Sequence, residues 1–412
     1  MTDAKPIPSY PIRPVCAIFG VLLIGYGGLQ VMAAGDRGLE QQLCRYWGCW
    51  NEAVVEQTYQ SYFDGKMNAS QFSTDLVQAL VHEPASSFRW CDLADALLVA
   101  GDRGKAETCM RRAVELGPNS APVLLRAANF EFRVGDDRRA LALLGQILRT
   151  VPDYDAIVFS DFDRFAGGVG RTLELAMPSD RHAGQAWLHH LMDIRANAGD
   201  LRKTWEWLEH RSLTDDAITI DFVNYLVRSG QVDAAEAVWL PFATRREHQF
   251  RRPNEIFNGD FEVPPTRSAL DWSASMPDGV QLTWATGESH TGRVALKLDF
   301  NAQDNLSFNH VYQEAIVQPG PHRFEAFLKA DSVTTDQGLG FHIFDAQQQA
   351  RLDVSTDPVT GSIGWTAQRK DFVVPAQTRL LRIELRRLAS HKFDNKIKGT
   401  VWVDSVMLYA AR

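Results

Sequence analysis

The stretch WCDLADALLVAGDRGKAETCMRRAVELGPN, from Trp90 to Asn119, contains two helical runs joined at Gly101-Asp102 and closed by Pro118. Its apolar and small residues recur at helical spacing and form a stripe along the runs: Leu93, Leu97, Ala106, Met110 and Ala113. Gly101 permits the turn, and Ala106 is small enough for two antiparallel helices to approach closely. A proline cannot continue a helix, so Pro118 ends the second run. The stretch therefore predicts a helix pair.

The same pattern returns 34 residues further along the chain. The turn, the small residue and the closing proline recur at Gly135-Asp136, Ala140 and Pro152. In the other direction, Pro84 lies 34 residues before Pro118. Three prolines at a constant interval indicate an internal repeat with copies at 53–86, 87–120 and 121–154.

The order W-x-x-L, G, A, A, P in the copy at 87–120 resembles the tetratricopeptide repeat, and the copies at 121–154 and 53–86 match it less completely. This resemblance implies helix pairs that stack into a curved solenoid, whose groove binds a protein partner. Helix pairs continue beyond Pro152 without the exact register, with turns expected at Gly199-Asp200 and Gly230. We therefore expect tetratricopeptide-like helical repeats over residues 50–243.

The composition bounds the class of protein. The chain has 412 residues, 45% of them hydrophobic and 23% charged, which indicates two or three ordinary globular domains. Its formal net charge of -8 argues against nucleic acid as a partner, because binding phosphates requires a basic face.

Residues 15–34, VCAIFGVLLIGYGGLQVMAA, carry no charge and match the roughly 30 Å of a bilayer's hydrocarbon core. We expect a transmembrane helix here, in contact with the lipid bilayer, after a cytoplasmic tail at 1–14. A signal peptide cleaved near Val31 and Ala33 is the alternative. The predicted localisation is the bacterial inner membrane, with a single pass and the bulk of the chain in the periplasm.

Four cysteines follow this span, at Cys44, Cys49, Cys91 and Cys109. An even number in an exported protein allows disulfides, and free, buried thiols are the alternative. Zinc is disfavoured because no close histidine pair accompanies the CRYWGC stretch.

The helical half contains no convincing catalytic motif. Asp161-Phe162-Asp163 has the D-x-D form that holds a metal-nucleotide in many glycosyltransferases, but that chemistry needs strand-helix alternation around it. A capping or turn role is favoured for these aspartates. The sequence also lacks a G-x-S-x-G nucleophile motif, so we expect no enzyme.

After an arginine-rich linker at 244–255, the apolar period changes from helical to alternating. Val294-Leu296-Leu298 and Leu339-Phe341-Ile343 are examples, and turn residues such as QPGPH recur between the runs. Residues 256–412 are therefore predicted to form an antiparallel β-sandwich. The expected fold class is a multidomain chain, helical first and β-structured afterwards.

Several segments of this second half follow one another in the order typical of the jelly-roll carbohydrate-binding modules of the galactose-binding-like superfold. They are IFNGDFE (256–262), Trp272, GRVALKL (292–298), VQPGPHRFEAFLKA (317–330), Trp365 with FVVPA (372–376), and GTVWVDSVML (399–408). The resemblance implies sugar binding on one sheet face or in rim loops, and a structural calcium that joins the first strand to the last.

Sugar sites combine aromatic rings, which stack on pyranose faces, with polar side chains for the hydroxyl groups. The candidates for carbohydrate binding are Trp284, His342, Phe344, Trp365 and Arg382. For each aromatic residue, a place in the sandwich core is the alternative.

The candidates for the calcium site are Asn258, Asp260, Glu262 and Asp404. Calcium accepts carboxylate and carbonyl oxygens in a flexible shell, and it would relieve the repulsion between Glu262 and Asp404. In the alternative, Glu262 caps a turn and Asp404 accepts backbone N–H bonds.

The predicted function is a membrane-anchored periplasmic scaffold that binds a partner protein through its repeats and a polysaccharide through its jelly roll. Its architecture places it in exopolysaccharide or O-antigen assembly. The alternative is a structural protein-protein adaptor without a sugar site.

Overall fold

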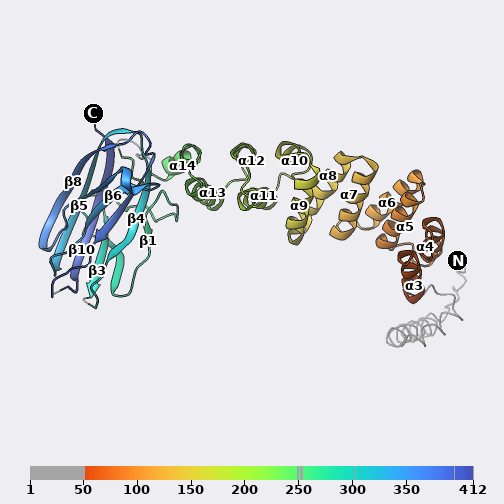
Figure 1. Cartoon of the computed structure of the whole chain (residues 1–412), viewed down its shortest axis with the longest axis horizontal. Coiled ribbons are helices and arrows are strands. Elements are labelled where there is room, and N and C mark those ends of the chain that lie inside the picture. The colour runs from red at the N-terminus through yellow and green to blue at the C-terminus, as the bar shows by residue number, and fades with distance from the viewer. Residues whose placement is uncertain (1–51, 248–249, 251–253, 302, 394, 412) are drawn as a thin grey trace, which may run out of the picture. The chain divides into compact units, whose positions relative to one another are not determined.

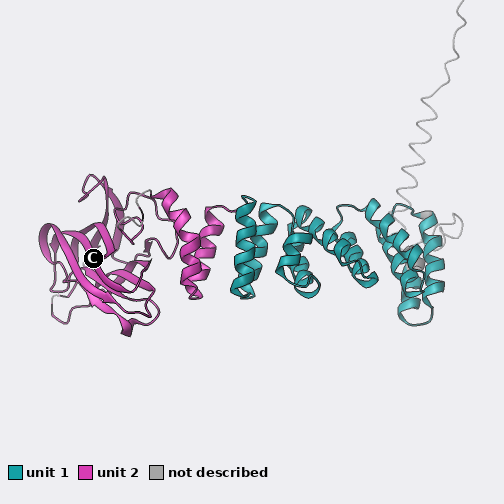
Figure 2. Ribbon diagram, turned by 90° about the horizontal axis from the view of Figure 1, so that it is seen from above, with its two compact units in different colours: residues 1–213 teal, residues 214–412 magenta. Residues whose placement is uncertain are grey.

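A computed structural model of the chain describes residues 52–247, 250, 254–301, 303–393 and 395–411. The chain divides into two compact units, Met1–Leu213 and Thr214–Arg412 (Figure 2). The first unit is helical, and the second combines a helix pair with a β-sandwich (Figure 1).

Within its described residues, the first unit is built from antiparallel helices. They are α3 (Glu52–Phe63), α4 (Ala69–His82), α5 (Ser87–Val99), α6 (Arg103–Leu116), α7 (Ala121–Val134), α8 (Asp137–Thr150), α9 (Asp155–Phe165), α10 (Val169–Leu175), α11 (Arg181–Asp193) and α12 (Ala198–His210). A short 3-10 turn, Pro152–Tyr154, precedes α9.

The 34-residue period is visible in the helix boundaries, because α4, α6 and α8 begin at residues 69, 103 and 137. Gly101 and Gly135 both have positive φ, which a glycine adopts at no steric cost. The next residue caps the following helix each time: the Asp102 carboxylate accepts from Lys105 N, and the Asp136 carboxylate from Arg139 N. The helix pairs predicted from the repeat are therefore confirmed.

Close approach of the paired helices depends on small residues. Ala106 of α6 and Ala140 of α8 are completely buried, as is Ala235 in the second unit. Because protein interiors are close-packed, a larger side chain at these positions is expected to displace a neighbouring helix.

Replacing Ala106 by leucine is expected to destabilise the chain by about 1–3 kcal/mol through overpacking. Arg103→Leu is the control on the same helix, because Arg103 is exposed and only its surface ion pair with Glu107 is lost. Urea unfolding should show a lower midpoint for the Ala106 variant and a nearly unchanged midpoint for the control. A larger loss at Arg103 would contradict the helix register.

The pairs after Pro152 depart from the pattern. Gly199, predicted to lie in a turn, lies in the first turn of α12. The turn is formed by Arg195, which has positive φ, and Asn197 caps the helix by accepting from Asp200 N. An asparagine cap therefore replaces the Gly-Asp turn of the earlier repeats.

The second unit begins with two helices, α13 (Asp216–Arg228) and α14 (Val232–Arg246). The strands are β1 (Ser273–Ala274), β2 (Val280–Thr286), β3 (Val294–Asn301), β4 (Phe308–Ile316), β5 (Gly320–Val333), β6 (Gly340–Asp345), β7 (Asp353–Ser355), β8 (Gly361–Val374), β9 (Leu380–Arg387) and β10 (Lys398–Ala410). They form two antiparallel sheets, sheet A in the order β1-β4-β9-β6-β7 and sheet B in the order β2-β3-β10-β5-β8. The predicted antiparallel sandwich is therefore confirmed.

The pair α13–α14 is attached to the sandwich. The Trp239 ring packs edge-on against Phe257, with 5.1 Å between ring centroids. Arg379, just before β9, contacts Asp233 of α14 at 2.9 Å. The compact units divide after Leu213, and the predicted helical range 50–243 continues into the second unit as α13 and α14.

The predicted membrane span at 15–34 and the tail at 1–14 lie outside the described residues. Among the described helices, none combines the length and apolar composition that a bilayer crossing requires. This finding contradicts the predicted localisation, a single pass through the bacterial inner membrane with the bulk of the chain in the periplasm.

Cys91 and Cys109 are buried free thiols. Burial raises the pKa of Cys91 to about 11, which makes its thiolate rare at neutral pH. This fits the alternative of free, buried thiols for these two residues, while Cys44 and Cys49 lie outside the described part of the chain.

Candidate functional site

One face of sheet A carries aromatic and charged side chains in place of apolar ones. Along each strand, alternate residues point into the sandwich core, as Val311, Ile383 and Phe341 do. Their neighbours point the other way, and the strand register places them side by side on a surface that we call the outer face of sheet A. Its members are Tyr312, Glu314, Arg382, Glu384, His342, Phe344 and Asp353.

His342 is at the centre of a charged cluster on this face. Its Nδ1 lies 2.9 Å from a Glu384 carboxylate oxygen, and its Nε2 lies 2.9 Å from an Asp353 oxygen. The ring is thus held between two carboxylate groups. The hydrogen bond from His342 lowers the pKa of Asp353. The ring of Phe344 stacks on His342 with 4.6 Å between centroids, so the cluster combines a flat apolar surface with charge.

A second aromatic ring on this face, Tyr312 of β4, contacts the cation of Arg382 on the neighbouring strand β9. The Arg382 guanidinium lies over the Tyr312 ring, with its Cζ atom 3.7 Å from the ring centroid. This is within the distance of a cation–π interaction. Arg382 Nε is buried and has no hydrogen-bond partner among the described residues. Glu314, opposite Arg382 in the register, has a raised pKa because burial disfavours its charged form.

A hollow of about 470 Å³ lies at the β1 side of this face, and we call it the edge hollow. The segment before β1, strands β1, β4 and β9, and helix α13 all contribute to it. It is lined by Asn224, Val227, Arg228, Pro265, Arg267, Ser268, Ala269, Trp272, Ser273, Ala274, Trp284, Tyr312, Glu314 and Arg382. Its volume falls within the roughly 300–1,000 Å³ of small-molecule sites.

The structure brings most of the predicted sugar-binding residues to one region. His342, Phe344 and Arg382 share the outer face of sheet A. Trp284, about one-third exposed on β2, lines the edge hollow. Trp365 is on β8 of sheet B, where its ring lies 5.7 Å from that of His290.

Sequence reasoning missed Tyr312 and Glu314 of β4. The available signal was their alternation with Val311, Gln313 and Ala315, which marks the opposite face of the strand. Gln313 obscured this alternation because it is polar although it faces the core. It is buried and bonds with the backbone of Phe257.

The predicted calcium ligands have protein partners in the structure. Glu262 accepts hydrogen bonds from the backbone N–H groups of Arg293 and Val294. Asp404 accepts from the N–H groups of His290, Thr291 and Ser405, and burial raises its pKa.

The other two predicted ligands belong to the same opening segment. The Asn258 side chain bonds twice with the Val263 backbone, and Asp260 accepts a long bond from Glu262 N. Within the described ranges, no group of three or more His, Cys, Asp or Glu side chains could hold a metal ion. The calcium site stays a prediction.

The two aspartates of the D-x-D motif, Asp161 and Asp163, lie on α9, and Asp155 is the first residue of the same helix. Asp163 pairs with His190 at 2.8 Å, and Asp155 with His182 at 2.8 Å. Both histidines belong to α11, so these carboxylates connect two neighbouring helices. Asp161 and Asp163 therefore lie inside the helix, and not at a cap or in a turn as the sequence predicted.

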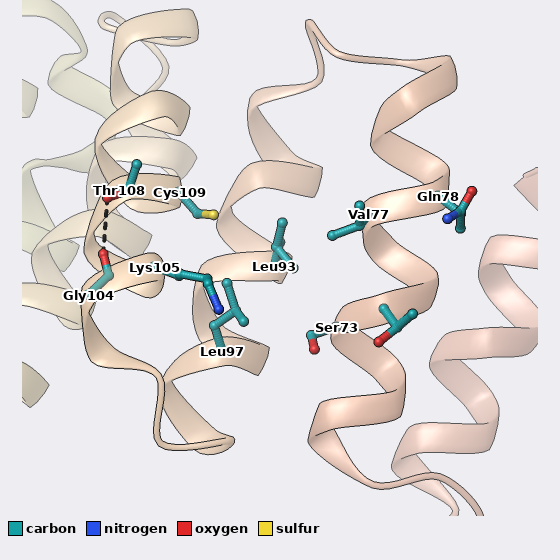
Figure 3. A pocket seen from close by; sticks show the side chains of 10 residues that line it. Ser73, Val77, Gln78, Leu93, Leu97, Gly104, Lys105, Thr108 and Cys109 are labelled. Carbon is teal, nitrogen blue, oxygen red and sulfur yellow. Dashed lines mark hydrogen bonds between the residues drawn. The ribbon is translucent and has the colours of Figure 1, made fainter.

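The helical unit has a hollow of its own, about 540 Å³, which lies over α5 and between α4 and α6 (Figure 3). Leu93 and Leu97 of α5 lie between Val77 of α4 and Lys105 of α6. Its lining is mostly apolar. The protein partner expected at the repeat groove stays a prediction.

In comparisons with known proteins, no family model and no curated protein matches this chain. The tetratricopeptide identity of the repeats is thus not confirmed by a family match.

Solved structures similar to the chain include several carbohydrate-binding modules. TmCBM61, solved with β-1,4-galactotriose, is 16% identical; the match covers 38% of this chain and 99% of that one, with a TM-score of 0.28. A family 16 carbohydrate-binding module has 16% identity, the same coverages and a TM-score of 0.27. The CBM22-1 xylan-binding domain of Paenibacillus barcinonensis Xyn10C has 14% identity, with coverages of 37% and 94% and a TM-score of 0.26.

Proposed function

We propose that this chain is a non-catalytic binding protein that holds a polysaccharide against the outer face of sheet A. The observation that carries the proposal is the placement of two aromatic rings on this face: Tyr312 lies under Arg382 of the neighbouring strand, and Phe344 stacks on His342 of its own strand. An aromatic ring covers the apolar face of a pyranose, while neighbouring charged groups bond its hydroxyl groups.

The polar groups of this face are held in position by the protein. Glu384 is almost fully buried and fixed by His342, and Arg386 donates to Ser355 Oγ at 2.6 Å. A preorganised surface loses little conformational entropy when a ligand binds, which favours recognition of a flexible polysaccharide.

The test is isothermal titration calorimetry of the full chain against a panel of soluble polysaccharides, after a glycan array has selected those that bind. We expect Tyr312→Ala and Phe344→Ala each to weaken binding about tenfold or more, because loss of one stacked ring costs about 1–3 kcal/mol. Thermal unfolding should show both variants folded.

Trp365→Ala is the matched control, because it removes an aromatic ring of similar exposure from sheet B. Unchanged affinity in the control, with losses in the two sheet A variants, supports the proposed face. Losses confined to the control would overturn it. A chain that binds no polysaccharide at all would leave the structural adaptor as the better description.

A further inference from the structure

The edge hollow gathers three arginines from separate elements. Arg228 comes from the last turn of α13, Arg267 from the segment before β1, and Arg382 from β9. Among the residues that the structure describes, none of the three guanidinium groups has a carboxylate partner within ion-pair distance. Arginines elsewhere in this unit do have such partners, as Arg323 has with Asp371 and Arg369 with Glu325.

The lining of the edge hollow contains these three arginines and one carboxyl group. Glu314 is that group, and its burial favours the neutral form. Since cations outnumber carboxylates in the lining, we expect a positive potential in the hollow.

Arg267 has a strained backbone conformation that hydrogen bonds from α13 maintain. Its φ is +70°, a conformation that a residue with a side chain adopts only at a cost of about 1–3 kcal/mol. Asn224 of α13 holds the segment on both sides of the strained bend: its Nδ2 donates to Arg267 O at 3.2 Å, and its Oδ1 accepts from Ala269 N at 2.7 Å. Strain maintained in this way is typical of functional positions.

The segment is fixed from the sandwich side as well. The buried Asp271 carboxylate accepts from the backbone and hydroxyl of Thr266 and from Trp272 N. The arginine-bearing segment is thus held between a helix and a sheet, and the hollow is formed before any ligand arrives.

Aromatic residues complete the lining. Trp284 and Tyr312 both reach the hollow, and Tyr312 also belongs to the outer face of sheet A. A ligand that fits has a flat apolar face for the rings and an anionic group for the arginines. Arginine binds carboxylates in a two-bond geometry that selects this group.

We propose that the edge hollow binds a carboxylate-bearing sugar residue, a hexuronate, of the polysaccharide, with its carboxylate held by Arg228, Arg267 and Arg382. The inference rests on the proposed function, since the hollow continues the outer face of sheet A through Tyr312 and Arg382. It adds the chemical class of the ligand and assigns part of the site to helix α13.

The test uses polygalacturonate, alginate and hyaluronan, each beside its carboxyl-reduced form, titrated into the full chain. At least one polymer should bind about tenfold or more tightly in its carboxylated form, because hydrogen bonds to charged groups contribute about 1.5–3 kcal/mol. The double variant Arg228→Gln/Arg267→Gln should abolish this preference and leave the affinity for the reduced form within about twofold. Added salt should weaken only the carboxylated form.

Arg323→Gln is the control for loss of positive charge, because Arg323 is an exposed arginine on sheet B. An unchanged preference in this variant supports the hollow as its source, and an equal loss would overturn the inference. Equal binding of carboxylated and reduced polymers, still lowered by Phe344→Ala, would overturn the inference and leave the proposed function standing. Binding that depends on the two arginines and on Tyr312 but not on Phe344 would overturn the proposed sheet face and support the hollow.

Discussion

Replacing Arg387 by methionine is expected to destabilise the second unit by about 3–5 kcal/mol, because it removes a buried cation that several loops share. Arg387 is 1% exposed, and its guanidinium donates to the carbonyls of Gln337, Asn395 and Leu306. These carbonyls come from three separate loops at one end of the sandwich. Methionine fills similar space but leaves the Leu306 and Asn395 carbonyls without a donor among the described residues, while Gln337 O keeps the Thr335 hydroxyl.

Burial lowers the pKa of Arg387, because removal of the guanidinium from water disfavours its charged form. The measurement is urea unfolding of the full chain, followed by tryptophan fluorescence. The control is Arg369→Met, which removes an exposed arginine whose bidentate pair with Glu325 is expected to contribute about 0–1 kcal/mol. Similar midpoints for the two variants would contradict the structural role of Arg387.

Replacing Gly145 by leucine is expected to destabilise the helical unit by about 3 kcal/mol. A Cβ atom added at Gly145 of α8 would lie 2.0 Å from the backbone carbonyl oxygen of Ala176, at the end of α10. A backbone atom cannot rotate away as a side chain can, so the two helices must separate.

Gly104→Leu is the matched control for this change. Gly104 lies in α6, and a Cβ added there meets nothing within 4 Å. Leucine is the better helix former, so this variant should gain up to about 0.5–1 kcal/mol. The two changes are expected to have opposite signs in thermal unfolding followed by circular dichroism. A gain at both positions would show that α8 and α10 do not make this contact.

Much of the fold could be predicted because its determinants are local. The turns at Gly101 and Gly135, their aspartate caps and the small residue at Ala106 act within a few residues of one another, and each is where the sequence placed it. Alternation along Val294–Asn301 marked a strand for the same reason, since neighbouring side chains point to opposite faces. The prediction of a turn at Gly199 was wrong, because Asn197, two residues earlier, caps the helix. Glycine and asparagine both occur where a turn meets a helix, so the sequence alone did not distinguish the two positions.

The candidate site was only partly predictable. His342, Phe344 and Arg382 were chosen as residue types suited to sugar, and the strand register places them on one face. Trp365 has the same chemistry but lies on sheet B. No pattern within β8 distinguishes the two sheets, because pairing of β8 with β5 decides its place.

By itself, the sequence determined the 34-residue helix pairs, the change to alternating strands and the chemical character of the candidate residues. Those properties depend on hydrogen bonds and side-chain periodicity over a few residues. Only the tertiary structure decided that Tyr312 lies under Arg382, that Asn224 holds the bend at Arg267, and that α13 belongs with the sandwich. These contacts join residues 43 or more positions apart, and their geometry follows from strand register and helix docking, which local sequence patterns do not encode.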